Sequence, residues 1–512
     1  MITVLLLIGV MPSMFPLPQV FGWTGDITIL SNGNIQAIPA NPPIQRVGNL
    51  YTLTGDIDTT GVAITVRRAN AVLDGKQYTI HGDLSGIGVT IAANNVTVRN
   101  MMVESFKTGI LFGEDIDQWP GINSSTATGN FITGCNTGIR CVRTGFGPPF
   151  PLPGGKDERI IGNKLVNNTY GIRIFTSGST ISDNVLSDND EGIIDEHNNG
   201  GADLAGLGDN GNNIISGNNL TSNAVGIQLL GCKGETVNRN YVRANTGHGI
   251  LLGARSQYHD FSLVCSNNTL SGNAIIENDE DGIFLYGASS NTIEHNIIQA
   301  NNGDGIGLQH YFNDFSYGNE SRWENSTDNI IRDNSIVSNQ GCGIFSNSSG
   351  NLIYHNNFLD NTPQVVPGAE SNTWDNSYPS GGNYWSNYVD TDNYGGLLQN
   401  LPGSDGICDH RYIIAIGNRD NYPLMSMSFS DEFSTTINDR WTWTNQPQNW
   451  QVSSGWLVIT PTLGTNFWSG VETGQFLCQW MRGNFMIQTK VSATLSTNFQ
   501  QAGLMIWYRV TR

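Results

Sequence analysis

Short segments in which apolar and polar residues alternate recur along most of this chain. In "NTIEHNIIQAN" Ile alternates with polar residues, and a Gly-Ile pair opens the next segment. Such pairs occur at Gly109, Gly138, Gly171, Gly192, Gly226, Gly249, Gly282, Gly305 and Gly343. The alternation is typical of strands, and the shortest intervals, about 22 residues, are typical of a solenoid. The pattern predicts coils of short strands, stacked in parallel around inward Ile, Leu and Val.

Glycine and asparagine are expected to serve this architecture. We expect many of the 61 Gly at bends between strands, because Gly tolerates positive φ. Asn tolerates left-handed backbone, and stacked Asn side chains can bond to the coil above. Most asparagines are therefore interpreted as structural, and His295 and His355, each beside an Asn, as turn residues.

Composition excludes several classes of protein. Charged residues are 13% of the chain and the net charge is -19, which disfavours long helices and a nucleic-acid partner. The 7 cysteines include no Cys-x-x-Cys pair, so neither a disulfide framework nor a zinc ribbon is implied. Bridges Cys135–Cys141 and Cys232–Cys265 are alternatives to our interpretation of most cysteines as buried apolar filler.

The apolar N-terminus predicts export. Residues 1–22 read "MITVLLLIGVMPSMFPLPQVFG", which is too short to span a bilayer and fits a secretory signal peptide without its basic region. Asn-x-Ser/Thr triplets, as at Asn95, agree with export but also arise by chance in such a composition. We expect a secreted, extracellular or cell-surface protein with no transmembrane span in this chain.

Two stretches carry resemblances to known families. "AVLDGKQYTIHG", the repeats that follow it, and "GGNYWSNYVDTDNYGG…DGICDHRYIIAIGNRDNYPLM" (Gly381 to Met425) resemble the NosD-type β-helix family. This resemblance covers about residues 47–425 and implies a right-handed parallel β-helix. Cys408 stands where that family's pattern has a second Gly. The Trp-rich stretch from Phe429 to Arg512 resembles the concanavalin-like β-sandwich at the C-terminal end of some β-xylosidases, but it is about half as long.

These patterns predict an all-β chain, a right-handed parallel β-helix followed by a partial antiparallel β-sandwich. The expected parts are a signal peptide (1–22), an N-terminal lead-in (23–46), the β-helix with loop insertions (47–360), a C-terminal cap (361–428) and the truncated sandwich (429–512).

Five insertions, each after a Gly-Ile strand, concentrate the candidate chemistry. Insertions at one position of a solenoid stack on one side, where functional residues gather on loops. Acids with His can perform acid–base chemistry on a polysaccharide. The candidate catalytic residues are Asp195, Glu196, His197, His259, Asp260 and His310. Aromatic rings can stack on sugars, and the candidate binding residues are Trp119, Tyr258, Tyr311, Trp323, Trp441, Trp443, Trp450 and Trp468. Solvated loops without function are the simpler alternative.

The cap contains clustered acids that permit two interpretations. Carboxylates are ligands that calcium prefers, and the candidates are Asp390, Asp392, Asp405 and Asp409. We prefer a polar cap that closes the end of the solenoid, so calcium is an option and no cofactor is required. Copper would need clustered Cys, Met or His. Only Cys408 and His410 lie close together in the sequence. The NosD-type resemblance therefore implies the fold of that family but not the accessory role in copper-site maturation from which the family takes its name.

Three functions remain open on the sequence alone. The first is engagement of polysaccharide or glycoprotein glycans by the stacked loops and the Trp-rich module. The second is a polysaccharide lyase, hydrolase or epimerase that acts at the loop ridge. The third is a structural adhesin or envelope protein without a sugar site. No motif assigns a reaction, so enzymatic activity is left open.

Overall fold

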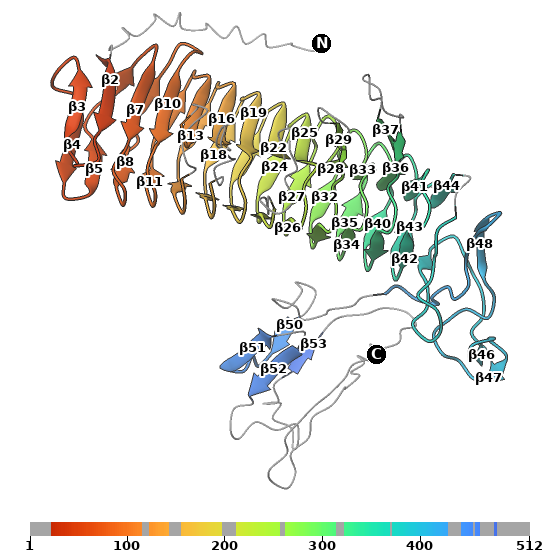
Figure 1. Cartoon of the computed structure of the whole chain (residues 1–512). Helices are drawn as coiled ribbons and strands as arrows, with labels where there is room; N and C mark the ends of the chain where they lie inside the picture. Colours follow the sequence, from red (N-terminus) through yellow and green to blue (C-terminus); the bar gives the residue numbers. More distant parts are fainter. Residues whose placement is uncertain are drawn as a thin grey trace, which may run out of the picture.

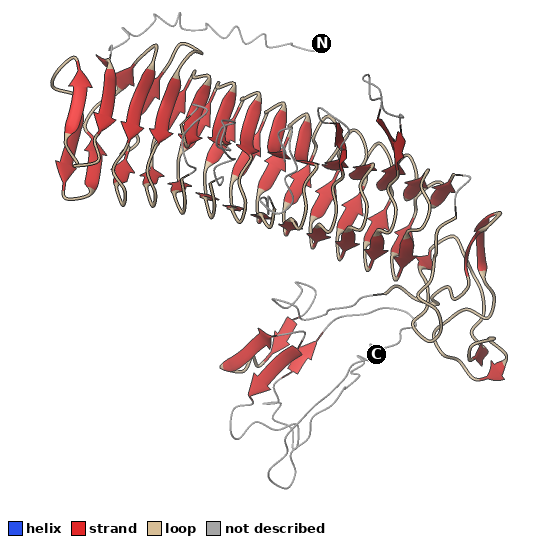
Figure 2. Ribbon diagram, in the orientation of Figure 1, coloured by secondary structure: helices blue, strands red, loops and turns tan. Residues whose placement is uncertain are grey.

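The computed structural model describes residues 22–114, 122–142, 155–196, 211–256, 262–313, 322–368, 371–428, 442–453, 456–460 and 476–478. These residues form strands and loops and contain no helix (Figure 2). Three long sheets, of 14, 14 and 13 strands, run the length of a stack of coils (Figure 1). The prediction of an all-β chain built on a right-handed parallel β-helix is confirmed.

The strands of sheet A, in spatial order, are β1 (Trp23–Thr24), β6 (Ile57–Asp58), β9 (Thr79–His81), β12 (Met102–Glu104), β15 (Phe131–Thr133), β18 (Lys164–Val166), β21 (Val185–Ser187), β24 (Asn219–Thr221), β27 (Tyr241–Arg243), β32 (Ala274–Ile276), β35 (Ile297–Gln299), β40 (Ser335–Val337), β43 (Asn357–Leu359) and β45 (Tyr384–Trp385). Those of sheet B are β3 (Ile35–Ile38), β2 (Asp26–Ile29), β7 (Val62–Val66), β10 (Ile87–Ile91), β13 (Thr108–Phe112), β16 (Thr137–Cys141), β19 (Tyr170–Ile174), β22 (Glu191–Glu196), β25 (Val225–Leu230), β28 (Ile250–Gly253), β33 (Ile283–Tyr286), β36 (Ile306–Gln309), β41 (Ile344–Ser346) and β44 (Val365–Pro367). Those of sheet C are β4 (Ile44–Val47), β5 (Leu50–Leu53), β8 (Val72–Asp74), β11 (Thr97–Arg99), β14 (Thr126–Thr128), β17 (Arg159–Ile161), β20 (Thr180–Ser182), β23 (Ile214–Ser216), β26 (Thr236–Asn238), β31 (Thr269–Ser271), β34 (Thr292–Glu294), β39 (Ile330–Arg332) and β42 (Leu352–Tyr354).

Six short antiparallel pairs complete the described strands. They are β29 (Arg255–Ser256) with β30 (Ser262–Leu263), β37 (Tyr311–Asn313) with β38 (Arg322–Glu324), β46 (Tyr394–Gly395) with β47 (Leu401–Pro402), β48 (Tyr412–Ala415) with β49 (Asn418–Asp420), β50 (Thr442–Thr444) with β53 (Phe476–Cys478), and β51 (Asn449–Ser453) with β52 (Trp456–Thr460). The last two pairs are antiparallel, as expected for the C-terminal segment, whereas its concanavalin-like identity remains a prediction.

The Ile of each Gly-Ile pair forms an unbroken column inside the solenoid. Ile110 pairs in register with Ile139, and the register continues coil by coil to Ile344. These side chains are buried in one continuous core. The Gly of each pair is also required by packing, because a Cβ at Gly109 would lie 2.6 Å from the Gly138 carbonyl oxygen. The glycines of the Gly-Ile pairs lie in strands of sheet B or directly before them, whereas other glycines, such as Gly129 and Gly162, have the positive φ expected at bends.

Most left-handed turn positions are instead taken by residues other than Gly. Asn95, Asp183, His295 and His355 have φ between 56° and 57°. Asn and Asp tolerate this region because their short polar side chains bond to nearby backbone. The prediction that the two histidines are turn residues is confirmed.

Three ladders of polar side chains join the coils at the corners between sheets. The ladder between sheets C and A is Asn130, Asn163, Asn184, Asn218, Asn240, Asn273, Asn296, Asn334, Asn356 and Asn383. The ladder between sheets A and B is Asn168, Asn189, Asn223, Asn245, Asn278, Asn301, Asn339 and Asn361. Each Asn accepts from the backbone of the coil before it and donates to the next Asn, so the structural interpretation of these asparagines is confirmed.

The third ladder, between sheets B and C, is less regular. It contains Ser125, Glu158, Ser179, Asn213, Glu235, Asn268, Asn291, Asn329, Asn351, Asn372 and Asn418. Glu158 and Glu235 accept the backbone N–H of Ser125 and Asn213, as an Asn would, but each places a carboxyl group in the interior. Burial raises the pKa of Glu158 to about 9, and the nearby Asp157 charge adds to the shift.

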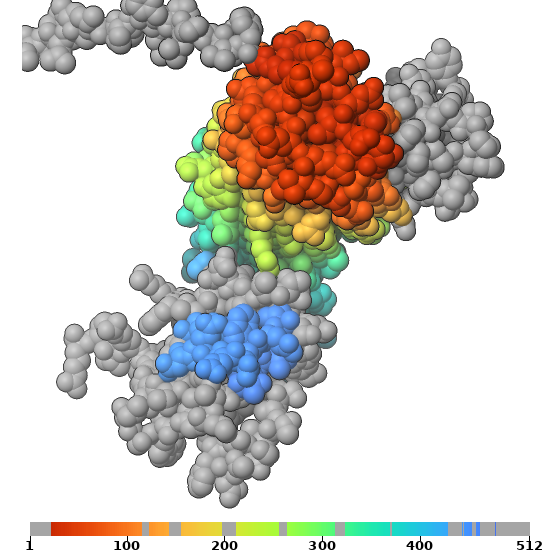
Figure 3. Space-filling view, turned by 90° about the vertical axis from the view of Figure 1, so that its left-hand side faces the viewer, coloured from red at the N-terminus to blue at the C-terminus, as the bar shows by residue number. Residues whose placement is uncertain are grey.

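Both ends of the solenoid are covered. At the first coils β2 pairs with β3 and β4 with β5 in antiparallel fashion, and Figure 3 views this end. At the last coils Trp374 and Trp385 are buried, and Trp385 stacks on Phe358 with ring centroids 4.3 Å apart. Covered ends matter because an open coil would expose both its apolar core and its unpaired strand edges.

Candidate functional site

The insertions come after strands of sheet B in the sequence. Their residues 115–121, 143–154, 197–210, 257–261 and 314–321 lie outside the described residues. The described hairpins β29–β30 and β37–β38 closely follow β28 and β36 of this sheet. We call the outer face of sheet B, next to these hairpins, the sheet B face.

A column of mostly titratable residues runs along the sheet B face, one position before each Gly-Ile pair from β22 onward. Its members are Glu191, Val225, His248, Asp281, Asp304 and Cys342. The Cys342 thiol lies 3.0 Å from Asp304 Oδ1, and the Asp304 N–H donates to Asp281 Oδ1 at 2.7 Å. From His248 to Cys342 each residue contacts the next, because successive coils are only about 4.8 Å apart.

Two acids of this column, Asp281 and Glu191, hold protons more tightly than ordinary carboxyls. Burial raises the pKa of Asp281 to about 7, although the Asp304 N–H opposes the shift. Burial likewise raises the pKa of Glu191 to about 7, and the charges of Asp190 and Glu196 add to it. Carboxyls that titrate near neutral pH suit general acid–base chemistry.

His248 is oriented by two contacts. Its Nδ1 accepts the Asp281 N–H at 3.2 Å, so its Nε2 carries the proton and points to Glu280 at 3.0 Å. Burial lowers the pKa of this imidazole, and the Glu280 charge opposes that shift. The imidazole is therefore held in one orientation, with its Nε2 towards the Glu280 carboxylate.

Aromatic rings continue from His248 towards the hairpin β37–β38. His248 stacks on Phe284, Phe284 on Tyr286, and Tyr286 contacts Tyr311 edge to face, with centroids 4.5, 5.8 and 5.0 Å apart. On the hairpin, Trp323 packs against His310 at 4.3 Å and Phe312 at 4.6 Å. Trp323 is 56% and Phe312 42% exposed. These seven residues form the aromatic run.

Three of the predicted catalytic residues, Asp195, Glu196 and His310, lie in the described part of the chain. Asp195 faces the core and is fully buried, whereas Glu196 faces outward and pairs with Arg173 at 2.7 Å. His310 Nδ1 lies 3.3 Å from the Asn347 carbonyl oxygen. The other three candidates, His197, His259 and Asp260, lie outside the described residues. Their catalytic roles remain predictions.

The predicted aromatic binding residues divide in the same way. Tyr311 and Trp323 belong to the aromatic run, and Trp443 and Trp450 have centroids 5.5 Å apart in the C-terminal segment. The remaining candidates, Trp119, Tyr258, Trp441 and Trp468, lie outside the described residues.

The acids of the cap are held by backbone N–H groups. Asp392 accepts from the backbone of Asp405 and Gly406, and Asp409 accepts from that of Asn393 and Tyr394. The Asp390 carboxylate similarly accepts the His410 N–H at 2.7 Å, and Asp405 accepts that of Ile407. These contacts describe turn-capping carboxylates, as expected for a polar cap, and calcium at the four positions remains a prediction.

The cysteines whose side chains the structure describes are buried free thiols. They are Cys135, Cys141, Cys232, Cys265, Cys342 and Cys408. Neither predicted alternative bridge is formed. The Cys408 Sγ lies 3.4 Å from Met425 Sδ, but His410 turns to Asp390 instead.

Several candidate functional residues escaped sequence reasoning, although a signal for them exists. Glu191, His248 and Asp281 each directly precede a Gly-Ile pair, so aligning coils on that pair stacks them in one column. Glu235 can be found similarly, because aligning coils on the third ladder places it where neighbouring coils have Asn.

Comparisons with known proteins agree with the fold. The family model described as "Right handed beta helix region" matches residues 154–319 and 254–378. None of the curated proteins matches this sequence. No helix of the described residues is long and apolar enough to cross a bilayer.

Solved structures similar to this chain include three proteins that act on polysaccharides by name. A mutant of the periplasmic alginate epimerase AlgG is 14% identical, with a TM-score of 0.39, over 64% of this chain and 78% of its own. The A-module of the Azotobacter vinelandii mannuronan C-5 epimerase AlgE6 is 14% identical, at 0.39, over 63% and 87%. The catalytic domain of a GH87 alpha-1,3-glucanase is 13% identical, at 0.44, over 64% and 65%. The strand pairing and the family model together identify the fold of this chain as a right-handed parallel β-helix.

Proposed function

We propose that this chain binds polysaccharide along the sheet B face, with the aromatic run as the surface on which sugar rings stack. The observation that supports it is the exposed pair Trp323 and Phe312 on the hairpin β37–β38, which also carries Tyr311, the last of the rings that begin at His248. Exposed rings held by other rings lose little side-chain entropy when a ligand covers them.

The polar groups beside the rings suit the same ligand. Glu280, Asp281 and Asp304 supply carboxyl oxygens next to Phe284. A sugar ring offers apolar C–H faces and hydroxyl donors, so alternating rings and acceptors match both parts of it. Export, predicted from residues 1–22, would bring the protein to such polymers.

The replacement Trp323→Ala should weaken retention on a polysaccharide about tenfold, because one stacked ring contributes about 1.4 kcal/mol. Affinity electrophoresis through gels that contain neutral or uronic polysaccharides measures the loss. The matched control is Tyr241→Ala, because Tyr241 is 38% exposed but lies on sheet A. The proposal would be contradicted if Trp323→Ala and Phe312→Ala were both retained as strongly as wild type on every polysaccharide that retains wild type.

Enzymatic turnover at the same face is the second candidate, and Asp281 and Glu191 favour it because the pKa of each lies near 7. A lyase, hydrolase or epimerase needs such groups within reach of the sugar. If turnover occurs, its rate should change around pH 7, and Asp281→Asn should remove that limb of the pH profile. New reducing ends, unsaturated ends and epimer ratios measure it. A profile that Asp281→Asn leaves unaltered would place the chemistry elsewhere.

A further inference from the structure

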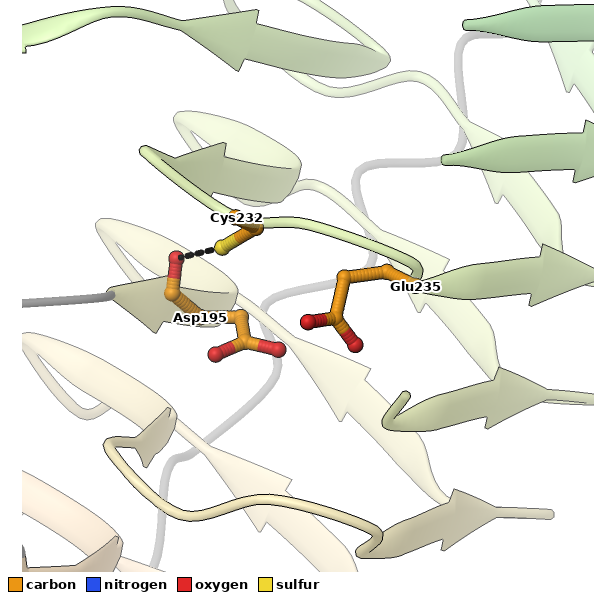
Figure 4. Close-up of side chains that lie close together, drawn as sticks. All are labelled: Asp195, Cys232 and Glu235. Carbon is orange, nitrogen blue, oxygen red and sulfur yellow. Dashed lines mark hydrogen bonds between the residues drawn. The ribbon is translucent and has the colours of Figure 1, made fainter. Parts of the chain in front are cut away.

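A group of acids and thiols lies inside the solenoid, at the corner between sheets B and C. Among residues the structure describes, Asp195, Cys232 and Glu235 are the one set of three or more His, Cys, Asp or Glu with ligand atoms within 4.8 Å of one another. Figure 4 shows the two carboxylates facing each other and the Cys232 Sγ 3.1 Å from the Asp195 carbonyl oxygen. Their exposed fractions are 0%, 0% and 1%.

The place of Asp195 in the core is the first argument. It pairs in register with Ile174 on β19 and Leu229 on β25, both of which belong to the apolar core. A carboxylate in such a column is costly unless a proton or a cation neutralises it. Glu235 brings a second carboxyl into the same space, and a single divalent ion can serve both.

Asn213 orients both carboxyls. Its side-chain amide donates to Asp195 Oδ2 at 2.9 Å, and its backbone N–H donates to Glu235 Oε2 at 2.6 Å. Donors of this kind fix the direction of metal-binding carboxylates from the outer shell. The two N–H donors of Asn213 also offset part of the negative charge that the carboxylates place in the core.

Cys265 supplies a second thiol. It occupies the same place in the next coil as Cys232, since Lys233 and Ser266 form a parallel bridge. Its Sγ accepts the Cys232 N–H at 3.2 Å. Cys265 lies outside the set within 4.8 Å, so a shift of its side chain towards the other three groups would complete four ligands, the number in a closed zinc site. Thiolates select zinc over magnesium or calcium, which prefer oxygen alone.

We propose that Asp195, Cys232, Glu235 and Cys265 bind one zinc ion inside the solenoid. The protons of the Cys232 and Cys265 thiols leave to the solvent as the ion binds, and so does the proton of Glu235, whose pKa is raised by burial. Asp195 lies near the end of β22, Cys232 and Glu235 follow β25, and Cys265 follows β28, so the ion joins three successive coils. It would hold the solenoid together where the insertion 197–210 leaves sheet B.

The full chain, purified under reducing conditions without added metal, should contain about one zinc ion by mass spectrometry of the metal. Cys232→Ser and Asp195→Asn should each lower that content at least tenfold. The matched control is Cys135→Ser, because Cys135 is another buried thiol that lies outside the cluster, and it should keep the metal.

A measurement on wild type keeps the test informative if the variants fail to fold. Refolding with cobalt in place of zinc should produce the thiolate charge-transfer absorption and strong visible bands of a tetrahedral site. Wild-type chain that is metal-free both as purified and after refolding with equimolar zinc would overturn the proposal. So would copper in place of zinc, or a disulfide between Cys232 and Cys265 in the protein purified without reductant.

Discussion

The replacement Asn273→Ala is expected to lower the free energy of unfolding by about 3–5 kcal/mol, because it leaves several buried groups without partners. Asn273 Oδ1 accepts from the backbone and side chain of Asn240, both at 3.0 Å. Its Nδ2 donates to the Val237 carbonyl oxygen and to Asn296 Oδ1, both at 2.9 Å. Denaturation by urea, followed by circular dichroism, measures the shift of the midpoint.

The matched control for the ladder is Asn302→Ala. Asn302 is an exposed neighbour whose side chain donates to Asp279 at the surface. Water replaces an exposed partner, so this variant should change stability by less than about 0.5 kcal/mol. Similar losses in the two variants would show that stacked Asn side chains contribute no more than ordinary surface amides.

Glu158→Gln is expected to raise stability relative to wild type by about 4 kcal/mol more at pH 8 than at pH 5. The folded chain keeps the Glu158 proton up to about pH 9, because burial raises the pKa, whereas the unfolded chain loses it near 4.5. Between these values the folded state binds the additional proton, so wild-type stability falls as pH rises. Gln has no proton to lose, and its contribution stays constant.

Urea midpoints at pH 5 and pH 8 separate this contribution from those of other buried acids. The other titratable groups that interact electrostatically with Glu158 are Asp157 and the Cys141 thiol. Glu277→Gln is the matched control, because Glu277 is an exposed partner of Arg243 and should leave the difference between the two pH values as in wild type. A pH dependence identical in wild type and Glu158→Gln would mean that Glu158 is ionised in the folded chain.

The repeats predicted most of the solenoid because its contacts are periodic. Each Gly-Ile pair returns to sheet B, so spacing alone implies that Ile110 lies beneath Ile139. The expected role of Gly at bends accounts for glycines such as Gly129 but not for Gly109, which is required by the close approach of the next coil. That approach depends on the distance between neighbouring coils at one corner, which cannot be predicted from the residues around Gly109 alone.

The candidate site was predicted less well, for a related reason. Sequence reasoning chose Asp195 because acids and a His cluster at Asp195 to His197. However, alternation along β22 turns Asp195 inward and Glu196 outward to Arg173. Neighbours in sequence are thereby separated, while Glu191, His248 and Asp281, which lie far apart along the chain, come to one face.

The sequence by itself determined the solenoid, its inward column and its Asn ladders, because these repeat a local pattern whose partner is always the next coil. Only the tertiary structure decided which chemistry meets. A longer insertion raises the residue number of every later side chain, but it does not change which side chain of the preceding coil lies beside it. Asp195 therefore meets Glu235, and His248 meets Asp281, through the register of sheet B and the third ladder.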